Sequence, residues 1–132
     1  MQRNADRAAG DTVVTGAVIE AAIEVHSALG PGLLESVYVA CLAHELRARG
    51  IRVSTEVPLP LRYRGVTIDC AYRLDLVVED SVIVEVKAAS KLLAVHHAQL
   101  LSYLRLAGMP VGLLINFHER HLRHGIRRLI NT

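Results

Sequence analysis

The 132-residue chain has the length of one domain with a single core, and its 52% hydrophobic and 21% charged residues are typical of a globular protein. Aromatic residues make up only 4% and tryptophan is absent, which argues against single-strand binding on rows of stacked aromatic side chains. The net charge of +2 is compatible with a nucleic-acid partner but is not evidence for one.

The chain is expected to begin with a flexible stretch, residues 1–11, followed by one folded domain, residues 12–132. Asp11 or Thr12 can cap the first helix, whose apolar residues recur at three- and four-residue spacing up to Leu29. Gly30-Pro31-Gly32 then ends that helix, because glycine and proline interrupt helical structure.

A second helix is expected over about residues 33–49, with Gly50 as its C-cap residue. Glu35 lies near its start, three residues before Tyr38, so the two side chains are neighbours on the helix surface. An acidic residue in the first turn also suits the helix dipole, and spacing alone favours that structural role for Glu35.

Several strands follow the two helices. Residues 51–57 alternate between apolar and polar side chains, and Pro58-Leu59-Pro60 is expected to break or end this strand and to mark a sheet edge. After the turn at Arg64-Gly65, residues 66–68 begin a further strand that leads to a central hairpin over residues 72–87.

A third helix is expected over about residues 92–106, ended by Gly108 and Pro110. Residues 111–117 are then expected to form a nearly all-apolar strand inside the sheet. The helical crossover would allow this strand to lie parallel to the strand that ends at Lys87. The basic end of the chain includes residues 126–130, an edge strand or a short helix. This order predicts an α/β (α+β) protein: a mixed sheet flanked by helices, two of them N-terminal.

The central hairpin brings charged residues together. Its two strands are joined by a polar turn, and a register with Asp75 opposite Glu85 puts both carboxylates and Lys87 on one face. The other face then receives only apolar side chains: Leu74, Leu76, Val78, Val82, Val84 and Val86. A slip by one residue would move the charges of one strand to that apolar face, so this register is the natural one.

The carboxylate pair has two interpretations. Side chains directly opposite in a hairpin are roughly 5 Å apart at Cβ, and two oxygen ligands at that distance can bind Mg²⁺ with waters and phosphate completing the shell. Lys87 could then orient a water or neutralise charge on a phosphate. The alternative is a salt bridge of Lys87 with Glu85 or Asp75, and the hairpin alone gives both about equal weight.

Three polar residues follow one side of the third helix: Gln99 and Tyr103 are four residues apart, and His96 lies three residues earlier. A helix that directly follows the Lys87 strand packs back over the sheet, so this stripe could face the carboxylates. The alternative is a partly exposed helix side with Tyr103 covering the core, which the stripe by itself favours.

These motifs carry a family resemblance. Asp75 followed by Glu85-Val86-Lys87 resembles the D…(D/E)XK core of the PD-(D/E)XK nuclease superfamily. Gln99-Leu-Leu-Ser-Tyr103 is similar to the QxxxY motif of its exonuclease branch, and Gly32-Leu-Leu-Glu35-Ser-Val-Tyr38 matches the motif of the bacterial GxxExxY protein family, which is placed in this superfamily. The resemblance covers about residues 12–131, although Leu74 stands where the superfamily motif has proline.

The resemblance implies a restriction-endonuclease-like fold and a role for each matching residue. Asp75, Glu85 and the backbone carbonyl of Val86 would hold Mg²⁺ or Mn²⁺, with Glu35 as an additional carboxylate. Lys87 would position or activate the attacking water. The remaining members of the set would support the site or contact a phosphate: Gln99, Tyr103, more loosely His96, and Tyr38.

The function expected from these residues is a metal-dependent nuclease that acts on nucleic acid, with DNA as the preferred substrate and RNA as the alternative. The alternative is a non-catalytic module on a nuclease fold that binds nucleic acid or protein, because the chain is short and has no dense basic patch. The intact set of Asp75, Glu85 and Lys87 favours chemistry. Nuclease folds of this size often pair, so a homodimer is also compatible with the sequence.

Other features point to structural roles and to location. His118, His121 and His124 could ligate zinc, but their spacing and the interleaved arginines favour a solvated basic segment. Cys41 and Cys70 lie among apolar neighbours and are expected to be buried, reduced thiols. With a polar start and no apolar run of about 20 residues, the protein is expected to be cytoplasmic, with no membrane partner.

Overall fold

A five-stranded mixed sheet in the order β1-β2-β3-β4-β5 forms the centre of the computed structural model. The structure describes residues 2–131, without the side chains of residues 2–10, 70 and 71. The elements are α1 (Gln2–Leu29), α2 (Glu35–Ala48), β1 (Val53–Tyr63), β2 (Val66–Val78), β3 (Val82–Lys87), α3 (Ala94–Ala107), β4 (Val111–Asn116), the short 3₁₀ helix η1 (Leu122–Gly125) and β5 (Ile126–Ile130).

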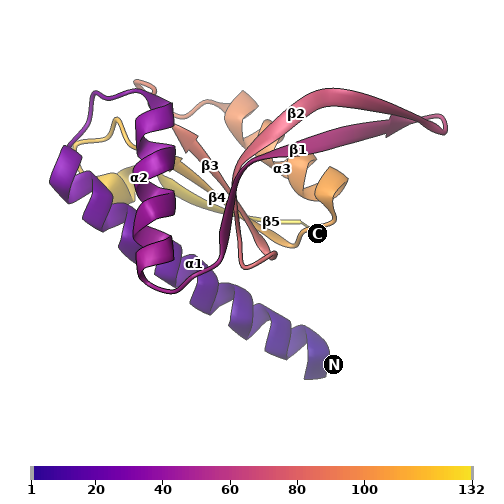
Figure 1. The fold of residues 1–132 in the computed structure, drawn as a ribbon, viewed down its shortest axis with the longest axis horizontal. Helices are drawn as coiled ribbons and strands as arrows, with labels where there is room; N and C mark the ends of the chain where they lie inside the picture. The colour runs from indigo at the N-terminus through magenta and orange to yellow at the C-terminus, as the bar shows by residue number, and fades with distance from the viewer. Residues whose placement is uncertain (1, 132) are drawn as a thin grey trace.

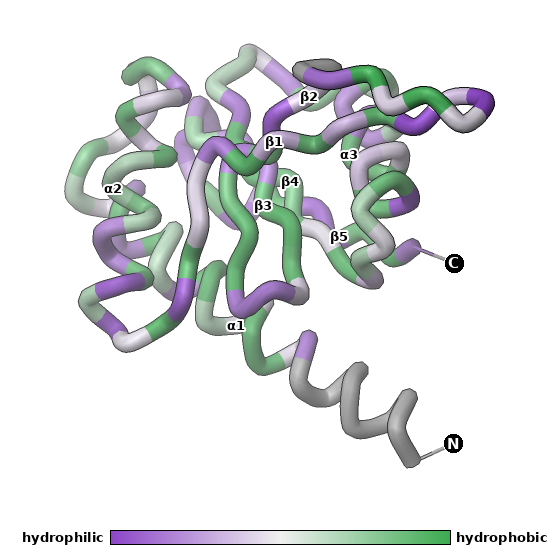
Figure 2. The backbone as a smooth tube through the Cα atoms, turned by 45° about the vertical axis from the view of Figure 1, so that its right-hand side comes forward, coloured by the Kyte–Doolittle hydropathy of each residue, from purple (hydrophilic) through white to green (hydrophobic). Residues whose placement is uncertain are grey.

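Helices cover both faces of this sheet. Helices α1 and α2 lie on one face and α3 on the other (Figure 1). Each face has its own apolar cluster: Leu76, Val84 and Leu113 belong to the cluster under α1 and α2, whereas Ile83 and Leu114 belong to the cluster under α3. The strands β3 and β4 are therefore buried from both sides. Their residues are among the most hydrophobic of the chain (Figure 2).

The predicted architecture is confirmed. Strand β3 pairs antiparallel with β2 and parallel with β4, and helix α3 makes the crossover between the two parallel strands. The choice left open at the end of the chain is resolved in favour of a strand, because β5 pairs antiparallel with β4 at the second edge of the sheet.

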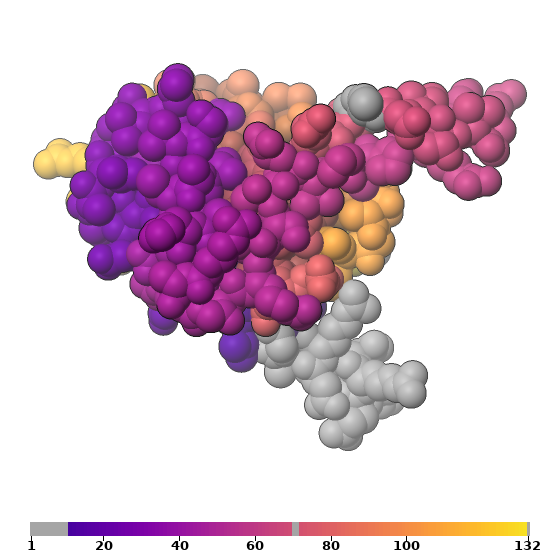
Figure 3. Space-filling view, in the orientation of Figure 1, coloured from indigo at the N-terminus to yellow at the C-terminus, as the bar shows by residue number. Residues whose placement is uncertain are grey.

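The prediction that Pro58-Leu59-Pro60 ends the strand is wrong, since β1 continues through both prolines to Tyr63. The segment does interrupt the regular pairing, because the β1–β2 register shifts between Leu59 and Leu61. It is correct that this strand lies at a sheet edge. An edge strand tolerates proline, because the missing N–H can face away from the neighbouring strand. The outer part of the β1–β2 hairpin projects from the rest of the molecule (Figure 3).

The predicted apolar face of the central hairpin is correct for all but one residue. Leu74 packs in the cluster under α3, not with Leu76 in the cluster under α1 and α2. The alternation of β2 therefore breaks at Asp75. Across from Asp75 in the β1–β2 register stands Glu56, whose φ of +50° is in the left-handed region and distorts β1 at this point.

The first helix begins earlier than the expected start after Asp11 or Thr12. The side chains of residues 2–10 lie outside the described part, so the flexibility of residues 1–11 stays a prediction. The prediction that the chain has no apolar run of membrane-spanning length is wrong: Asp11–Leu29 is long and apolar enough to cross a membrane, by length and composition only. A buried core helix passes the same test, and Val18, Ala21 and Ala22 of this segment are fully buried.

Candidate active site at the parting of strands β2 and β3

The backbone ladder between β2 and β3 ends one residue before the two carboxylates. The last paired residues are Leu76 and Val84, and the same register places Asp75 opposite Glu85 as predicted. Beyond that point each carboxylate bonds to the backbone of the other strand: the N–H of Asp75 donates to Oε1 of Glu85 at 3.1 Å, and the N–H of Val86 donates to Oδ2 of Asp75 at 2.9 Å. Side-chain oxygens thus replace backbone carbonyls, which fixes both carboxylates.

Burial makes this pair of negative charges costly. Glu85 is 5% exposed, and burial together with the neighbouring charge of Asp75 raises its pKa from 4.5 to about 8. Burial also raises the pKa of Asp75 from 3.8, while the hydrogen bond from Val86 and the charge of Lys87 act in the opposite direction. Near neutral pH the pair therefore holds a proton that a bound cation could replace.

Lys87 ends β3 on the same side as Glu85. Its Nζ lies 3.4 Å from Oε1 of Gln99 on α3. Among the described ion pairs none joins Lys87 to Asp75 or Glu85, so the salt-bridge interpretation is not what the structure shows. The ammonium group instead stands beside the carboxylates, near enough for its charge to lower both of their pKa values.

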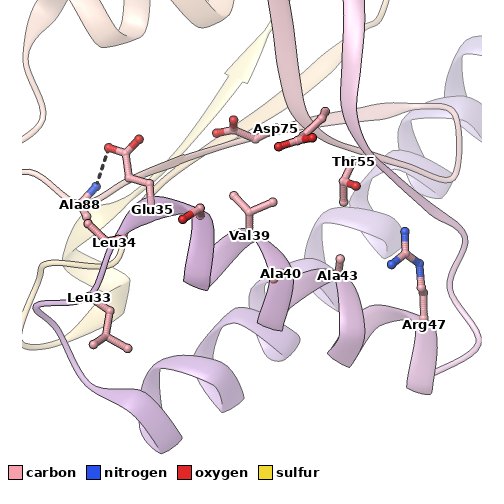
Figure 4. A pocket seen from close by; sticks show the side chains of 12 residues that line it. Leu33, Leu34, Glu35, Val39, Ala40, Ala43, Arg47, Thr55, Asp75 and Ala88 are labelled. Carbon is pink, nitrogen blue, oxygen red and sulfur yellow. Dashed lines mark hydrogen bonds between the residues drawn. The ribbon is translucent and has the colours of Figure 1, made fainter.

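Glu35 comes to the site from the start of α2. Its Oε2 accepts a hydrogen bond from the N–H of Ala88, the residue after Lys87, at 3.1 Å. Its charge also contributes to the raised pKa of Asp75. Glu35 and Asp75 line one pocket of about 810 Å³ between α2 and the base of the β1–β2 hairpin (Figure 4).

Tyr38 positions this end of α2 from inside the core. It is fully buried, and its ring stacks on Phe117 with centroids 4.5 Å apart. Its hydroxyl donates to the carbonyl of Gly30 at 2.6 Å and accepts from the N–H of Leu33 at 3.1 Å. Tyr38 therefore fixes the loop that leads to Glu35. The sequence predicted either a supporting role or a substrate contact for Tyr38, and its full burial is compatible with the supporting role.

The polar residues of α3 separate into two groups. Gln99 and Tyr103 face the sheet: burial and the charges of Glu85 and Asp75 raise the pKa of Tyr103 to about 12, and its ring lies 5.1 Å from that of Tyr72. His96 instead stabilises the start of the helix, where its Nδ1 accepts the N–H of Leu93 at 3.0 Å. This bond uses Nδ1 alone, so a contact of Nε2 with a phosphate stays a prediction.

Sequence reasoning missed two residues next to the site. Asn116 is fully buried, and its side chain exchanges two hydrogen bonds with the backbone of Ala89, at 2.8 and 3.0 Å, which fix the chain just after Lys87. A single amide in an otherwise apolar strand was the available signal. Glu56 lines the same pocket as Asp75, but the sequence around it reads as an ordinary exposed strand position.

A sequence profile described as the PD-(D/E)XK nuclease superfamily matches residues 12–129. The chain belongs to this superfamily. Its sheet and flanking helices are the superfamily's restriction-endonuclease-like α+β fold. Comparison with curated proteins and with solved structures gave no significant match. The closer likeness to the GxxExxY family stays a prediction.

Membership gives the carboxylate pair a context, because PD-(D/E)XK nucleases usually use divalent metal ions. Within the described residues, no three His, Cys, Asp or Glu side chains gather closely enough to form a metal cage. This includes the tail histidines, although the rings of His121 and His124 are 5.7 Å apart. Asp75 and Glu85 fit Mg²⁺ or Mn²⁺ nonetheless, since Mg²⁺ usually takes one or two carboxylates and keeps several waters.

Cys41 is not among the residues of this PD-(D/E)XK site. Cys41 is a free, half-buried thiol that packs against the cluster under α1 and α2. The side chain of Cys70 lies outside the described part, and its predicted burial stays a prediction.

Proposed function

We propose that this protein is a nuclease that hydrolyses phosphodiester bonds of nucleic acid, more specifically DNA, with Mg²⁺ or Mn²⁺. The observation that carries the proposal is the pair of buried Glu85 and half-buried Asp75, which lie side by side and are fixed by hydrogen bonds from opposite strands. A structural role would be served better by apolar residues at these positions, because two neighbouring carboxylates that are largely removed from water destabilise the fold unless they bind something positive.

The donor set suits a hard cation. Asp75 and Glu85 would hold the metal, with the carbonyl of Val86 as a backbone ligand and Glu35 as a further carboxylate at the pocket wall. When bound, the ion lowers the pKa of its water and offsets negative charge at the phosphate. Glu35 would join the ligands by exchanging its bond to the Ala88 N–H.

The remaining residues act on the water and the phosphate. Lys87 carries an ammonium group without an ion-pair partner among the described residues, so it can hold the attacking water or a phosphate oxygen. Gln99 restricts the position of that ammonium group. Tyr103, with a pKa of about 12, keeps its proton at physiological pH and serves as a hydrogen-bond donor rather than a base.

The proposal is tested by calorimetric titration of Mn²⁺ into the wild type and into Asp75→Asn/Glu85→Gln, followed by incubation with labelled linear, nicked and single-stranded DNA. Glu24→Gln/Asp69→Asn is a charge-matched control on exposed positions. We expect metal binding and cleavage in the wild type and the control, and neither in the site variant. A wild type that binds no metal and cleaves none of these substrates would contradict the proposal and favour a non-catalytic module.

A further inference from the structure

A second pocket, of about 470 Å³, lies apart from the carboxylate site, between the C-terminal end of α1 and the segment that follows β4. Helix α1 and the turn η1 are in contact there. Three basic residues of the segment line it: Arg120, His121 and Arg123. None of the catalytic residues proposed above belongs to its lining.

The arginines of this pocket are available to a ligand. Both side chains are exposed, and among the described residues neither Arg120 nor Arg123 has a carboxylate within ion-pair distance. Other exposed arginines of the described part, such as Arg105 and Arg128, also have no such partner, so what distinguishes Arg120 and Arg123 is that they line one pocket together. Two unpaired guanidinium groups that line one concave surface match the geometry and the charge of a phosphate group.

A buried histidine holds this segment in place. His26 of α1 is 9% exposed, and its Nε2 lies 2.7 Å from the carbonyl oxygen of Glu119. Because a carbonyl oxygen only accepts, Nε2 carries the hydrogen and the bond fixes the backbone next to Arg120. His26 thus acts as a positioning residue for the basic wall of the pocket.

The basic segment also starts at the catalytic edge of the sheet. Asn116 is paired with Lys87 across the parallel strands, and its Oδ1 accepts hydrogen bonds from the backbone of both Ala89 and His118. The chain that carries Arg120 and Arg123 therefore leaves the sheet beside Lys87. A polyanion held near Lys87 can extend along this segment.

We propose that this pocket binds a backbone phosphate of the nucleic-acid substrate other than the phosphate that is cleaved. The inference rests on the proposed nuclease function and adds to it a second contact, which positions the strand. The ligand is a phosphodiester within a chain, because two exposed arginines in an open pocket bind one phosphate weakly unless neighbouring phosphates are held elsewhere.

The test measures binding of a fluorescent 20-nucleotide DNA, single-stranded and duplex, by anisotropy in EDTA so that no metal-dependent cleavage occurs. The variant is Arg120→Ala/Arg123→Ala, and Arg105→Ala/Arg128→Ala removes the same charge at exposed positions outside the pocket. We expect the pocket variant to bind about tenfold more weakly, with a shallower salt dependence, and the control to bind nearly as well as the wild type. Thermal unfolding verifies that both variants are folded.

The outcomes separate this inference from the nuclease proposal. If both variants bind DNA equally weakly, the attraction is diffuse and the proposed phosphate site is overturned. Unchanged DNA binding in the pocket variant would also overturn it, even if the wild type cleaves DNA. If millimolar inorganic phosphate displaces the labelled DNA as well as unlabelled DNA does, the pocket binds free phosphate and the proposal is overturned. Mn²⁺ binding without any DNA binding by the wild type would overturn the nuclease proposal together with this inference.

Discussion

The pairing of β2 with β3 has two ends with opposite chemistry. At one end, the pairs Leu76–Val84, Val77–Ile83 and Val78–Val82 form a regular ladder of buried apolar residues. One residue further, Asp75 and Glu85 replace the ladder with side-chain hydrogen bonds, which places a half-buried and a buried carboxylate side by side. The apolar end therefore stabilises the hairpin, and this stability holds the polar end in an arrangement that is unfavourable by itself.

The largest effect on stability is expected from the apolar end. Ile83→Ala should lower the free energy of unfolding by about 2–5 kcal/mol, because Ile83 is fully buried in the cluster under α3 and truncation leaves a cavity. Urea unfolding measures this change, with Ile83→Val as the conservative comparison at about 0.5–1.5 kcal/mol. A loss in Ile83→Ala no larger than that in Ile83→Val would contradict the assignment of stability to this end.

The polar end should govern activity instead. Lys87→Met should lower the cleavage rate by about 10²–10³-fold, since it removes the charge that acts on the water or the phosphate. Metal affinity measured by calorimetry should change little, because Lys87 is not among the proposed ligands. Lys91→Met, an exposed lysine shortly after the strand, is the matched control. Wild-type rates in Lys87→Met would exclude Lys87 from the chemistry.

The carboxylate pair should make the metal-free protein less stable as pH rises. The folded-state pKa of Glu85, about 8, lies above its ordinary 4.5, so the folded state binds more protons than the unfolded state between these values. The stability from this protonation is complete below about pH 4.5 and is lost as pH rises through about 8.

Glu85→Gln should therefore unfold at higher urea than the wild type in EDTA at pH 9, by about 1–3 kcal/mol, with a smaller difference at pH 5. Urea titrations at both pH values make the comparison. A variant that is less stable than the wild type at pH 9 would show that the ionised Glu85 carboxylate stabilises the fold, contrary to the destabilisation expected from its burial beside Asp75.

The smallest effect is expected from the residue that orients Lys87. Gln99→Ala should slow cleavage about three- to tenfold, because the bond from Lys87 to Gln99 is long at 3.4 Å. The loss should appear in kcat rather than KM, and Gln99→Glu should shift the pH profile through its added charge. Ser102→Ala, half-buried on the same helix, provides the control. An unchanged kcat in Gln99→Ala would limit this residue to a packing role.

The pattern of the sequence was sufficient to predict that Asp75 lies opposite Glu85, because only that register buries the apolar residues of both strands together. The apolar strand after a crossover helix allowed a parallel placement of β4, which the structure shows. The pattern did not predict the break of alternation at Leu74, because the cause lies in the backbone of Glu56 on a different strand.

Contacts between distant segments explain the other differences. The helical pattern made Tyr38 a surface neighbour of Glu35, but the α1–α2 loop covers it and forms two hydrogen bonds with its hydroxyl. The helical pattern placed His96 on the side that faces the site, yet its Nδ1 accepts a hydrogen bond from the backbone at the start of the helix. Asn116 fixes the backbone just after Lys87 from the neighbouring strand, so no local pattern around Lys87 could indicate this contact.

Whether the pair of Asp75 and Glu85 is a cation site can be decided by a ¹³C NMR titration of the Glu85 side-chain carboxyl, assigned by comparison with Glu85→Gln, without metal and with saturating Mg²⁺. We predict that Glu85 titrates near pH 8 without metal and below its ordinary 4.5 with Mg²⁺, because the cation replaces the proton. A carboxyl that titrates near 4.5 in both conditions would contradict this prediction, since the pair would then be neither destabilised by burial nor a site for a divalent cation.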